Sequence, residues 1–133
     1  MTVEELLQLP TIKGLKLISG NLGVHREIST VTVVDTPDGF QWLKGNEVVI
    51  TTTYALEKTP NSFLDFISKL LSRNISALIV KSDRYIKVIP ENAKKLCDEK
   101  ALPLIYCPAI YAFADIINPT LSGIISKQAE QLK

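Results

Sequence analysis

The stretch that decides the fold covers residues 47–106 and reads EVVITTTYALEKTPNSFLDFISKLLSRNISALIVKSDRYIKVIPENAKKLCDEKALPLIY. Three short apolar runs, at residues 47–52, 77–81 and 102–106, alternate with two longer amphipathic segments. Apolar runs of this length are typical of strands that are buried on both faces of a sheet. Strand, helix, strand, helix and strand with short connections predict a βαβαβ unit with parallel strands and right-handed crossovers. The expected fold class is therefore α/β.

Apolar side chains at helical spacing mark the two helices of this unit. The first is expected to begin at Thr59-Pro60, because threonine caps helices and proline suits the first helical position. Its inward face holds Phe63, Phe66, Ile67, Leu70 and Leu71, and Asn74 ends it. The second helix is expected to open at Pro90, with Ala93, Leu96 and Cys97 facing inward. We expect a three-layer-like domain in which helices flank a mostly parallel sheet.

Residues upstream of this unit are predicted to add shorter elements. Thr2 and Glu5 form a capping box, which predicts a short helix over residues 3–9 that stops at Pro10. Strands are expected at residues 15–19 and 28–35, followed by a turn and one helical turn at residues 40–43.

The last segment of the chain is predicted to be helical from residue 111 to residue 117. Asn118-Pro119 is then either a kink or the start of a new helix. An amphipathic helix over residues 119–133 follows, and its apolar stripe comprises Leu121, Ile125, Ala129 and Leu132. We expect this stripe to mediate self-association, although the helix could instead fold back on its own domain. A helix that runs to the last residue also suggests a fragment of a longer protein.

The charge balance excludes one class of function. The 133 residues include 15 Lys and Arg against 14 Asp and Glu, which gives a net charge of +1. A domain that binds duplex nucleic acid by itself should show a clear cationic excess, because neutralisation of phosphates dominates that affinity. We therefore expect no direct nucleic-acid contact by this chain.

The sequence also bears on location. The N-terminus lacks the basic and apolar regions of a signal peptide, and no apolar stretch approaches the roughly 20 residues that span a bilayer. Cys97 and Cys107 show no CxxC or CxxH spacing, so we expect buried thiols rather than a zinc or redox motif. A soluble, cytoplasmic protein without membrane contact is predicted.

A search for catalytic motifs finds none. The chain lacks GxSxG, GxGxxG and GxxxxGK[ST], and its one histidine, His25, has no metal-ligand spacing around it. Asp35, Asp38 and Glu47 surround a turn, where solvated carboxylates are commoner than an acid–base pair. We expect no catalytic residue, no metal site and no cofactor, and hence no enzyme.

One edge of the predicted sheet carries polar groups suited to a ligand. Thr51, Thr52 and Thr53 follow an apolar strand, and the Asp35-Thr36 turn follows the preceding one. Ligands of open α/β sheets bind at the carboxyl ends of the strands, so both segments are expected in one shallow pocket. Strand propensity and loop capping would also explain the threonines, and composition alone favours that explanation. The candidate ligand residues are Asp35, Thr36, Trp42, Thr51, Thr52 and Thr53, and Trp42 either covers the pocket or packs beneath it.

Three segments of the chain resemble the N-terminal domain of PucR-type bacterial transcriptional regulators, the purine catabolism regulator family. They are TVEELLQLP at residues 2–10, VVDTPDGFQWLKGNEVVITT at residues 33–52, and LPLI at residues 102–105. In the family a strand leads through an acidic-proline turn to W-L-x-G-x-E and an apolar strand that ends in a threonine pair. This sequence departs from the family at Thr53, where glycine is usual, and at Thr36, where an acidic residue is common.

The resemblance implies a single sensory domain over residues 1–133, with DNA binding carried by a C-terminal helix-turn-helix that is absent here. Its ligand would be a small polar or heterocyclic metabolite. Two alternatives stay open: a dimerisation or protein-interaction module without a ligand, and a small α/β enzyme.

Overall fold

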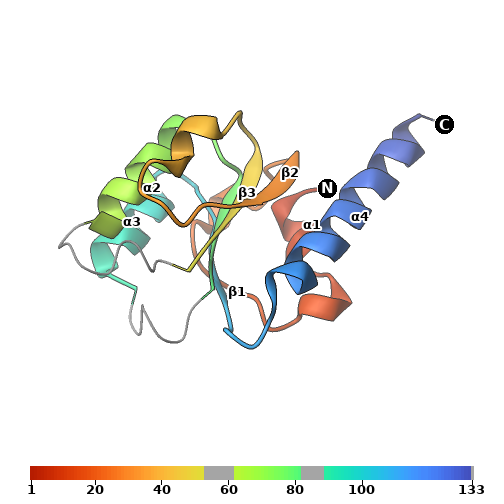
Figure 1. Cartoon of the computed structure of the whole chain (residues 1–133), viewed down its shortest axis with the longest axis horizontal. Coiled ribbons are helices and arrows are strands. Elements are labelled where there is room, and N and C mark those ends of the chain that lie inside the picture. The colour runs from red at the N-terminus through yellow and green to blue at the C-terminus, as the bar shows by residue number, and fades with distance from the viewer. Residues whose placement is uncertain (53–61, 82–88, 133) are drawn as a thin grey trace.

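The computed structural model describes residues 1–52, 62–81 and 89–132. Among them is a five-stranded sheet, which lies between the helices in Figure 1. The strand order is β1-β5-β4-β3-β2. The strands are β1 (Lys16–Ser19), β2 (Thr30–Val33), β3 (Glu47–Thr51), β4 (Ala77–Lys81) and β5 (Leu104–Cys107). The four strands from β2 to β5 are parallel, and β1 pairs antiparallel with β5. The predicted α/β class and the mostly parallel sheet are confirmed.

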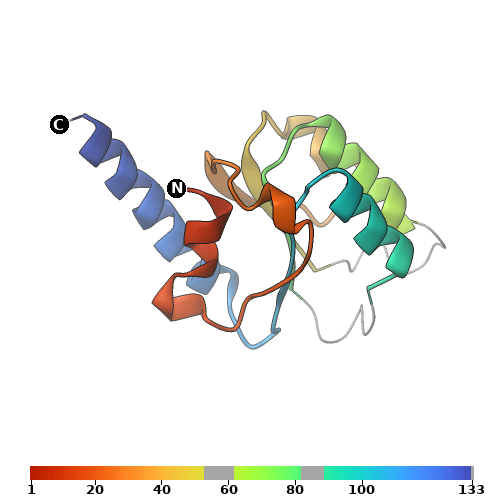
Figure 2. The same cartoon turned by 180° about the vertical axis from the view of Figure 1, so that it is seen from behind.

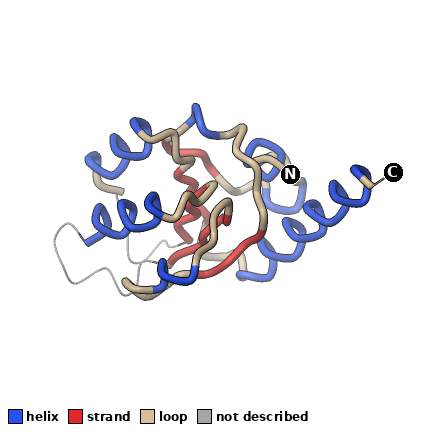
Figure 3. The backbone as a smooth tube through the Cα atoms, turned by 90° about the horizontal axis from the view of Figure 1, so that it is seen from above, coloured by secondary structure: helices blue, strands red, loops and turns tan. Residues whose placement is uncertain are grey.

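Two layers of helices cover the sheet, as Figure 3 shows from above. Helices α2 (Ser62–Ser72) and α3 (Glu91–Glu99) lie on one face and bury Phe66, Leu70 and Cys97 against Val49, Leu78 and Leu104. Helix α1 (Val3–Leu7), the 3-10 turn η1 (Pro10–Ile12) and helix α4 (Phe113–Gln131) lie on the other face. There they bury Leu6, Ile12 and Ile116 against Val48, Ile50 and Ile105. The central strands are apolar on both faces because each face meets a helical layer.

The ends of several elements differ from the predictions. The strand expected at residues 28–35 pairs only over β2. The helix expected over residues 3–9 already ends at Leu7, and Pro10 begins the separate turn η1 (Pro10–Ile12). The strand expected at residues 102–106 begins two positions later, after Pro103, which has no N–H for the ladder. The capping box is confirmed, since Glu5 N–H donates to Thr2 Oγ1 and Thr2 N–H donates to the Glu5 carboxylate. The predicted start at Thr59-Pro60 lies outside the described residues.

Helix α4 is continuous through Pro119, so neither a new helix nor a separate segment at residues 111–117 is found. Proline removes one helical hydrogen bond, but buried side chains on both sides of it hold the helix on the sheet. These are Ile116, Thr120 and Ile124. Packing on the sheet therefore outweighs the local cost of the proline.

The second half of α4 extends beyond the sheet (Figure 2). Ile124 is its last buried residue, and the residues from Ile125 to Leu132 are exposed. The ammonium of Lys127 lies 3.3 Å from a carboxylate oxygen of Glu5, which joins this half of the helix to α1. No helix among the described residues is long and apolar enough to cross a membrane.

Arg26 ties together the end of the sheet opposite the carboxyl ends of the parallel strands. Its guanidinium donates to the carbonyl oxygens of Ile75, Lys100 and Ala101, at 3.2, 3.0 and 2.9 Å. Two of these carbonyls directly follow α3, where a helix leaves acceptors without helical partners. The Arg26 side chain thus joins the N-terminal segment to the βαβαβ unit through three hydrogen bonds.

Candidate functional site

Asp35 lies at the carboxyl end of β2 and bridges to the end of β3. Its Oδ1 atom accepts a hydrogen bond from Thr51 Oγ1 at 3.1 Å and another from the backbone N–H of Thr52 at 2.7 Å. The register pairs Val33 with Ile50, so the two segments leave their strands at the same level. The structure therefore brings together the Asp35 turn and the Thr51-Thr52 edge, which the sequence placed side by side.

The two threonines have different surroundings. Thr51 is fully buried and its hydroxyl donates a hydrogen bond to Asp35, so it helps to fix the position of that carboxylate. Thr52 is half-buried and contributes its backbone N–H to the same carboxylate. Thr53 lies outside the described residues. At this edge, one oxygen of Asp35 is engaged, while the other, Oδ2, makes no hydrogen bond with any described residue.

A groove of about 560 Å³ opens beside the edge strand β2, between this strand and the 3-10 turn η3 (Gly39–Trp42). Its described lining comprises Thr30, Thr32, Val33, Val34, Asp35, Thr36, Gly39, Trp42, Leu43, Lys44 and Glu47. Trp42 is 72% exposed, so it stands at the rim and does not pack beneath the pocket. Asp35, Thr36 and Trp42 share this groove, whereas Thr51 and Thr52 are not part of its described lining and connect to it through their hydrogen bonds to Asp35.

Glu47 holds the corner between η3 and β3. Its carboxylate accepts from the backbone N–H groups of Lys44 at 2.6 Å and Gly45 at 2.8 Å, and the residue is only 5% exposed. Gly45 has a φ of 117°, which L side chains rarely adopt. The expectation that Glu47 is a solvated turn residue is therefore wrong. The W-L-x-G-x-E pattern contains this corner: Leu43 enters the core, Gly45 makes the turn and Glu47 binds it.

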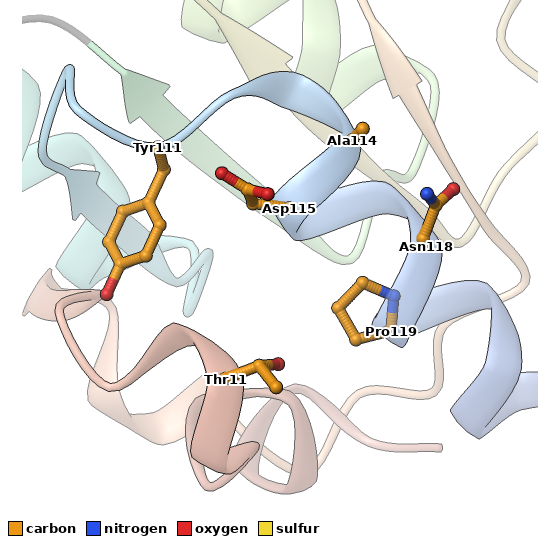
Figure 4. A pocket seen from close by; sticks show the side chains of 6 residues that line it. All are labelled: Thr11, Tyr111, Ala114, Asp115, Asn118 and Pro119. Atoms are coloured by element: carbon orange, nitrogen blue, oxygen red, sulfur yellow. The ribbon is translucent and has the colours of Figure 1, made fainter.

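A second hollow of about 500 Å³ lies between η1 and the start of α4 (Figure 4). Its described lining is Thr11, Tyr111, Ala114, Asp115, Asn118 and Pro119. The Tyr111 hydroxyl accepts from Gly14 N–H at 3.0 Å, and Asp115 accepts from Ala112 N–H at 2.8 Å. The first bond holds the segment before α4 against the residues that follow η1, and the second caps the start of α4. The side chains around this hollow therefore have a structural role. No local sequence pattern points to this hollow, since η1 and α4 are distant in the chain.

Lys81, at the end of β4, was also missed. Its ammonium donates to the carbonyl oxygen of Ala109 at 3.2 Å and lies 5.2 Å from the centre of the Phe113 ring. Ala109 precedes α4 and Phe113 is its first residue. The only signal in the sequence was the position of this lysine at the end of a predicted strand. Its partners follow a later strand and come into reach only through the fold.

The described residues offer little for catalysis. No three His, Cys, Asp or Glu side chains among them gather closely enough to hold a metal ion. Cys97 and Cys107, both described, are buried and not joined by a disulfide. Burial, followed by the negative charge of Asp98, raises the pKa of the Cys97 thiol to about 12. That thiol is therefore protonated at neutral pH and is a poor nucleophile.

The residues of the predicted self-association stripe lie along α4. Leu121 is partly buried and packs against the core, whereas Ile125 is 64% and Leu132 89% exposed. Ala129 is exposed as well. Only the start of the stripe, at Leu121, therefore packs back on the domain. From Ile125 onwards the stripe is exposed to solvent.

Comparison with known proteins agrees with the resemblance seen in the sequence. The model of the purine catabolism regulatory protein-like family, PucR, matches residues 5–124, and this match ends at the last buried residue of α4. The chain is also 32% identical over all of its 133 residues to the purine catabolism regulatory protein of Bacillus subtilis (strain 168). It spans 25% of the length of that relative. The chain belongs to the purine catabolism regulatory protein-like (PucR) family.

Proposed function

We propose that residues 1–133 form the ligand-responsive regulatory domain of a bacterial transcriptional regulator that works in the cytoplasm and is not an enzyme. The observation that carries this proposal is the Asp35 network, a carboxylate at the carboxyl edge of a parallel sheet with one oxygen engaged by Thr51 and Thr52. That edge is where open α/β sheets bind ligands. Family membership and the name of the Bacillus subtilis relative support the regulatory role.

The chemistry of the groove favours a small polar or heterocyclic metabolite. A carboxylate accepts hydrogen bonds from amines and ring N–H groups, and the hydroxyl of Thr36 both donates and accepts. The exposed indole of Trp42 offers a flat apolar surface at the rim, on which a ring can stack. Each of these groups lines the same groove.

DNA binding is assigned to a helix-turn-helix in another part of the full regulator. The net charge of +1 supports this division, because specific binding to DNA relies on neutralising phosphates. In a gel-shift titration at physiological salt, the isolated chain is expected to give no sequence-dependent complex. A nanomolar, sequence-dependent complex would contradict the division.

The ligand site is tested in two steps. A thermal-shift screen of purines, ureides and organic acids selects a binder, and calorimetric titration then compares the parent protein with Asp35→Asn. Asparagine keeps an oxygen for Thr52 N–H but removes the charge, so affinity should fall roughly tenfold or more. Asp38→Asn, an exposed change in the same turn, serves as the control and should bind like the parent. Equal affinity in all three proteins would contradict the site, and a screen without any binder would contradict the sensor.

A second candidate function is dimerisation, and the exposed stripe on α4 favours it. Ile125 and Leu132 stand one heptad apart on a helix that extends beyond the domain, which is the spacing of a coiled-coil seam. Light scattering should report a dimer for the parent and a monomer for Ile125→Asp. Ser126→Asp, next to it on an exposed position, should stay dimeric. A monomeric parent or an unchanged Ile125→Asp dimer would remove this function.

A further inference from the structure

Strand β2 is the outermost strand on one side of the described sheet, and its edge is open for pairing. The strand order ends at β2, which pairs with β3 alone among the described strands (Figure 1). Val34 N–H donates to the Ile50 carbonyl at 2.9 Å, so this residue and every second residue before it face β3. Val31 and Val33 lie between those residues, and their N–H and C=O groups therefore point away from the sheet. Outside the ladder with β3, no hydrogen bond between described residues uses these groups.

The two edges of the sheet differ in how they are protected. An open edge is a template for pairing with another chain, and proteins block such edges with lysine, proline or bulges. The opposite edge strand, β1, carries the exposed Lys16 and a register irregularity between Leu17 and Ser19. Strand β2 reads TVTV at residues 30–33, without a charge or a proline, and its register with β3 runs without a shift. Its β-branched residues suit a strand, so this edge has the properties of one that pairs.

Charged side chains of opposite sign lie at the two ends of this edge. Lys44 lies at the amino end, where it lines the groove together with Thr30. The next residue, Gly45, accepts a hydrogen bond from Ser29 Oγ at 3.1 Å through its carbonyl oxygen. Asp35 lies at the carboxyl end, and its Oδ2 makes no hydrogen bond with any described residue. A strand with the same charges that runs antiparallel to β2 therefore meets each charge with its opposite.

We propose that β2 pairs with β2 of a second copy of the chain, antiparallel about a two-fold axis beside Thr32. A two-fold axis makes one surface meet itself, so a strand edge pairs antiparallel with its own copy. This register sets Val31 opposite the partner's Val33, where both residues point their backbone groups outward, and forms about four backbone hydrogen bonds. It also brings the partner's Asp35 to the Lys44 end of the edge.

Neighbouring registers fit less well. Moving the axis to Val31 sets the partner's Asp35 opposite Glu27, whose carboxylate is exposed, and like charges directly opposite each other destabilise a strand pair. Moving the axis to Val33 leaves only that residue paired within the two strands. An axis between residues sets outward-facing backbone groups against inward-facing ones, so the hydrogen bonds are lost. The register about Thr32 is the one in which charges and hydrogen bonds both match.

This inference goes beyond the proposed function, because it requires neither a ligand nor the stripe on α4. The paired edge involves few residues of each copy, and small interfaces are weak and transient. A covalent trap is therefore the suitable test, since a disulfide captures such a contact as it forms. The native thiols, Cys97 and Cys107, are buried, so the parent protein should not crosslink under mild oxidation.

Thr32→Cys tests the pairing and its register together. In the proposed register Thr32 and the partner's Thr32 form a non-hydrogen-bonded pair with Cα atoms about 4.5 Å apart, within the reach of a disulfide. Thr30→Cys is the matched control, because Thr30 and the partner's Thr30 then lie roughly 13–14 Å apart, beyond that reach. With oxidised glutathione as the oxidant, Thr32→Cys should form a linked dimer at least roughly tenfold faster than Thr30→Cys on non-reducing electrophoresis.

Second substitutions in the Thr32→Cys protein show which surface makes the contact. Val33→Lys places a charge on the edge and should slow the crosslink at least roughly tenfold. Leu22→Lys is its control and should not slow the crosslink, since Leu22 is 80% exposed in the 3-10 turn η2 (Asn21–Gly23), which lies against residues 101–103. Far-UV circular dichroism confirms that each variant is folded before the rates are compared.

The outcomes separate this inference from the proposals above. Equal rates for Thr32→Cys and Thr30→Cys, or a rate that Val33→Lys leaves unchanged, would overturn the pairing. The preference for position 32 over position 30 should persist when Ile125→Asp is added to both proteins. Its loss there would overturn the inference and assign the contact to the stripe on α4. No outcome depends on a ligand, so the inference can fail while the proposed ligand site stands.

Discussion

Replacing Glu47 with alanine should lower the free energy of unfolding, because this carboxylate is buried and hydrogen-bonded although the sequence suggests an exposed turn residue. The side chain accepts two backbone hydrogen bonds, from Lys44 and Gly45, while almost fully buried. Hydrogen bonds to charged groups contribute roughly 1.5–3 kcal/mol each. Lys44 is exposed, so its N–H regains water in the variant and part of the loss is returned. A net loss of about 2–4 kcal/mol in the free energy of unfolding follows.

Urea unfolding followed by far-UV circular dichroism measures this loss. With a slope of about 2 kcal/mol per M for a chain of this size, the midpoint should fall by about 1–2 M. Glu99→Ala, an exposed change near the end of α3, should shift the midpoint by less than about 0.3 M. Trp42, the one tryptophan, lies in the turn that Glu47 holds, so its fluorescence anisotropy should also drop in Glu47→Ala. A midpoint within the range of Glu99→Ala would refute the structural role given to this carboxylate.

Three further changes test other parts of the fold. Arg26→Met keeps the apolar stem but removes hydrogen bonds to three carbonyls, and chemical unfolding should show a loss of about 2–4 kcal/mol. Gly20→Ala should cost about 2–4 kcal/mol in the same assay, because Gly20 has a φ of 75° and a Cβ there would collide with the Leu102 carbonyl. The backbone N–H of Thr2, and then Lys127, lower the pKa of Glu5 below 4.5, so its stabilising contribution is present above that pH and lost as the pH falls through the lowered value. The difference in melting temperature between the parent and Glu5→Gln should therefore be larger at pH 7 than at pH 3, and an equal difference would exclude this linkage.

Local signals predicted the central unit of the fold well. The apolar run from Ala77 to Lys81 became β4 with its predicted bounds, and Asn74 ends the helical region before it with a φ of 56°. Buried strands and amphipathic helices follow from the pattern of apolar residues along a continuous segment, so they can be predicted without knowing which distant residues they contact. The proximity of Asp35 to Thr51 followed as well, because parallel strands end at a common edge.

Features that depend on distant contacts were not predictable in the same way. Nothing local shows that β1 pairs with β5 at the opposite edge, where Lys16 meets Tyr106. Pro119 reads as a break, and only its packing on the sheet keeps α4 continuous. Glu47 reads as a surface residue because its partners are backbone N–H groups, which leave no trace in the side-chain pattern.

One NMR experiment tests most directly whether a ligand binds at the carboxyl edge of the sheet. The uniformly ¹⁵N-labelled chain is titrated with the strongest binder from the metabolite screen while all amide resonances are followed. A ligand site at this edge predicts saturable shifts that centre on Asp35, Thr36 and Thr52. Shifts confined to the hollow between η1 and α4, or scattered over the surface without saturation, would contradict it.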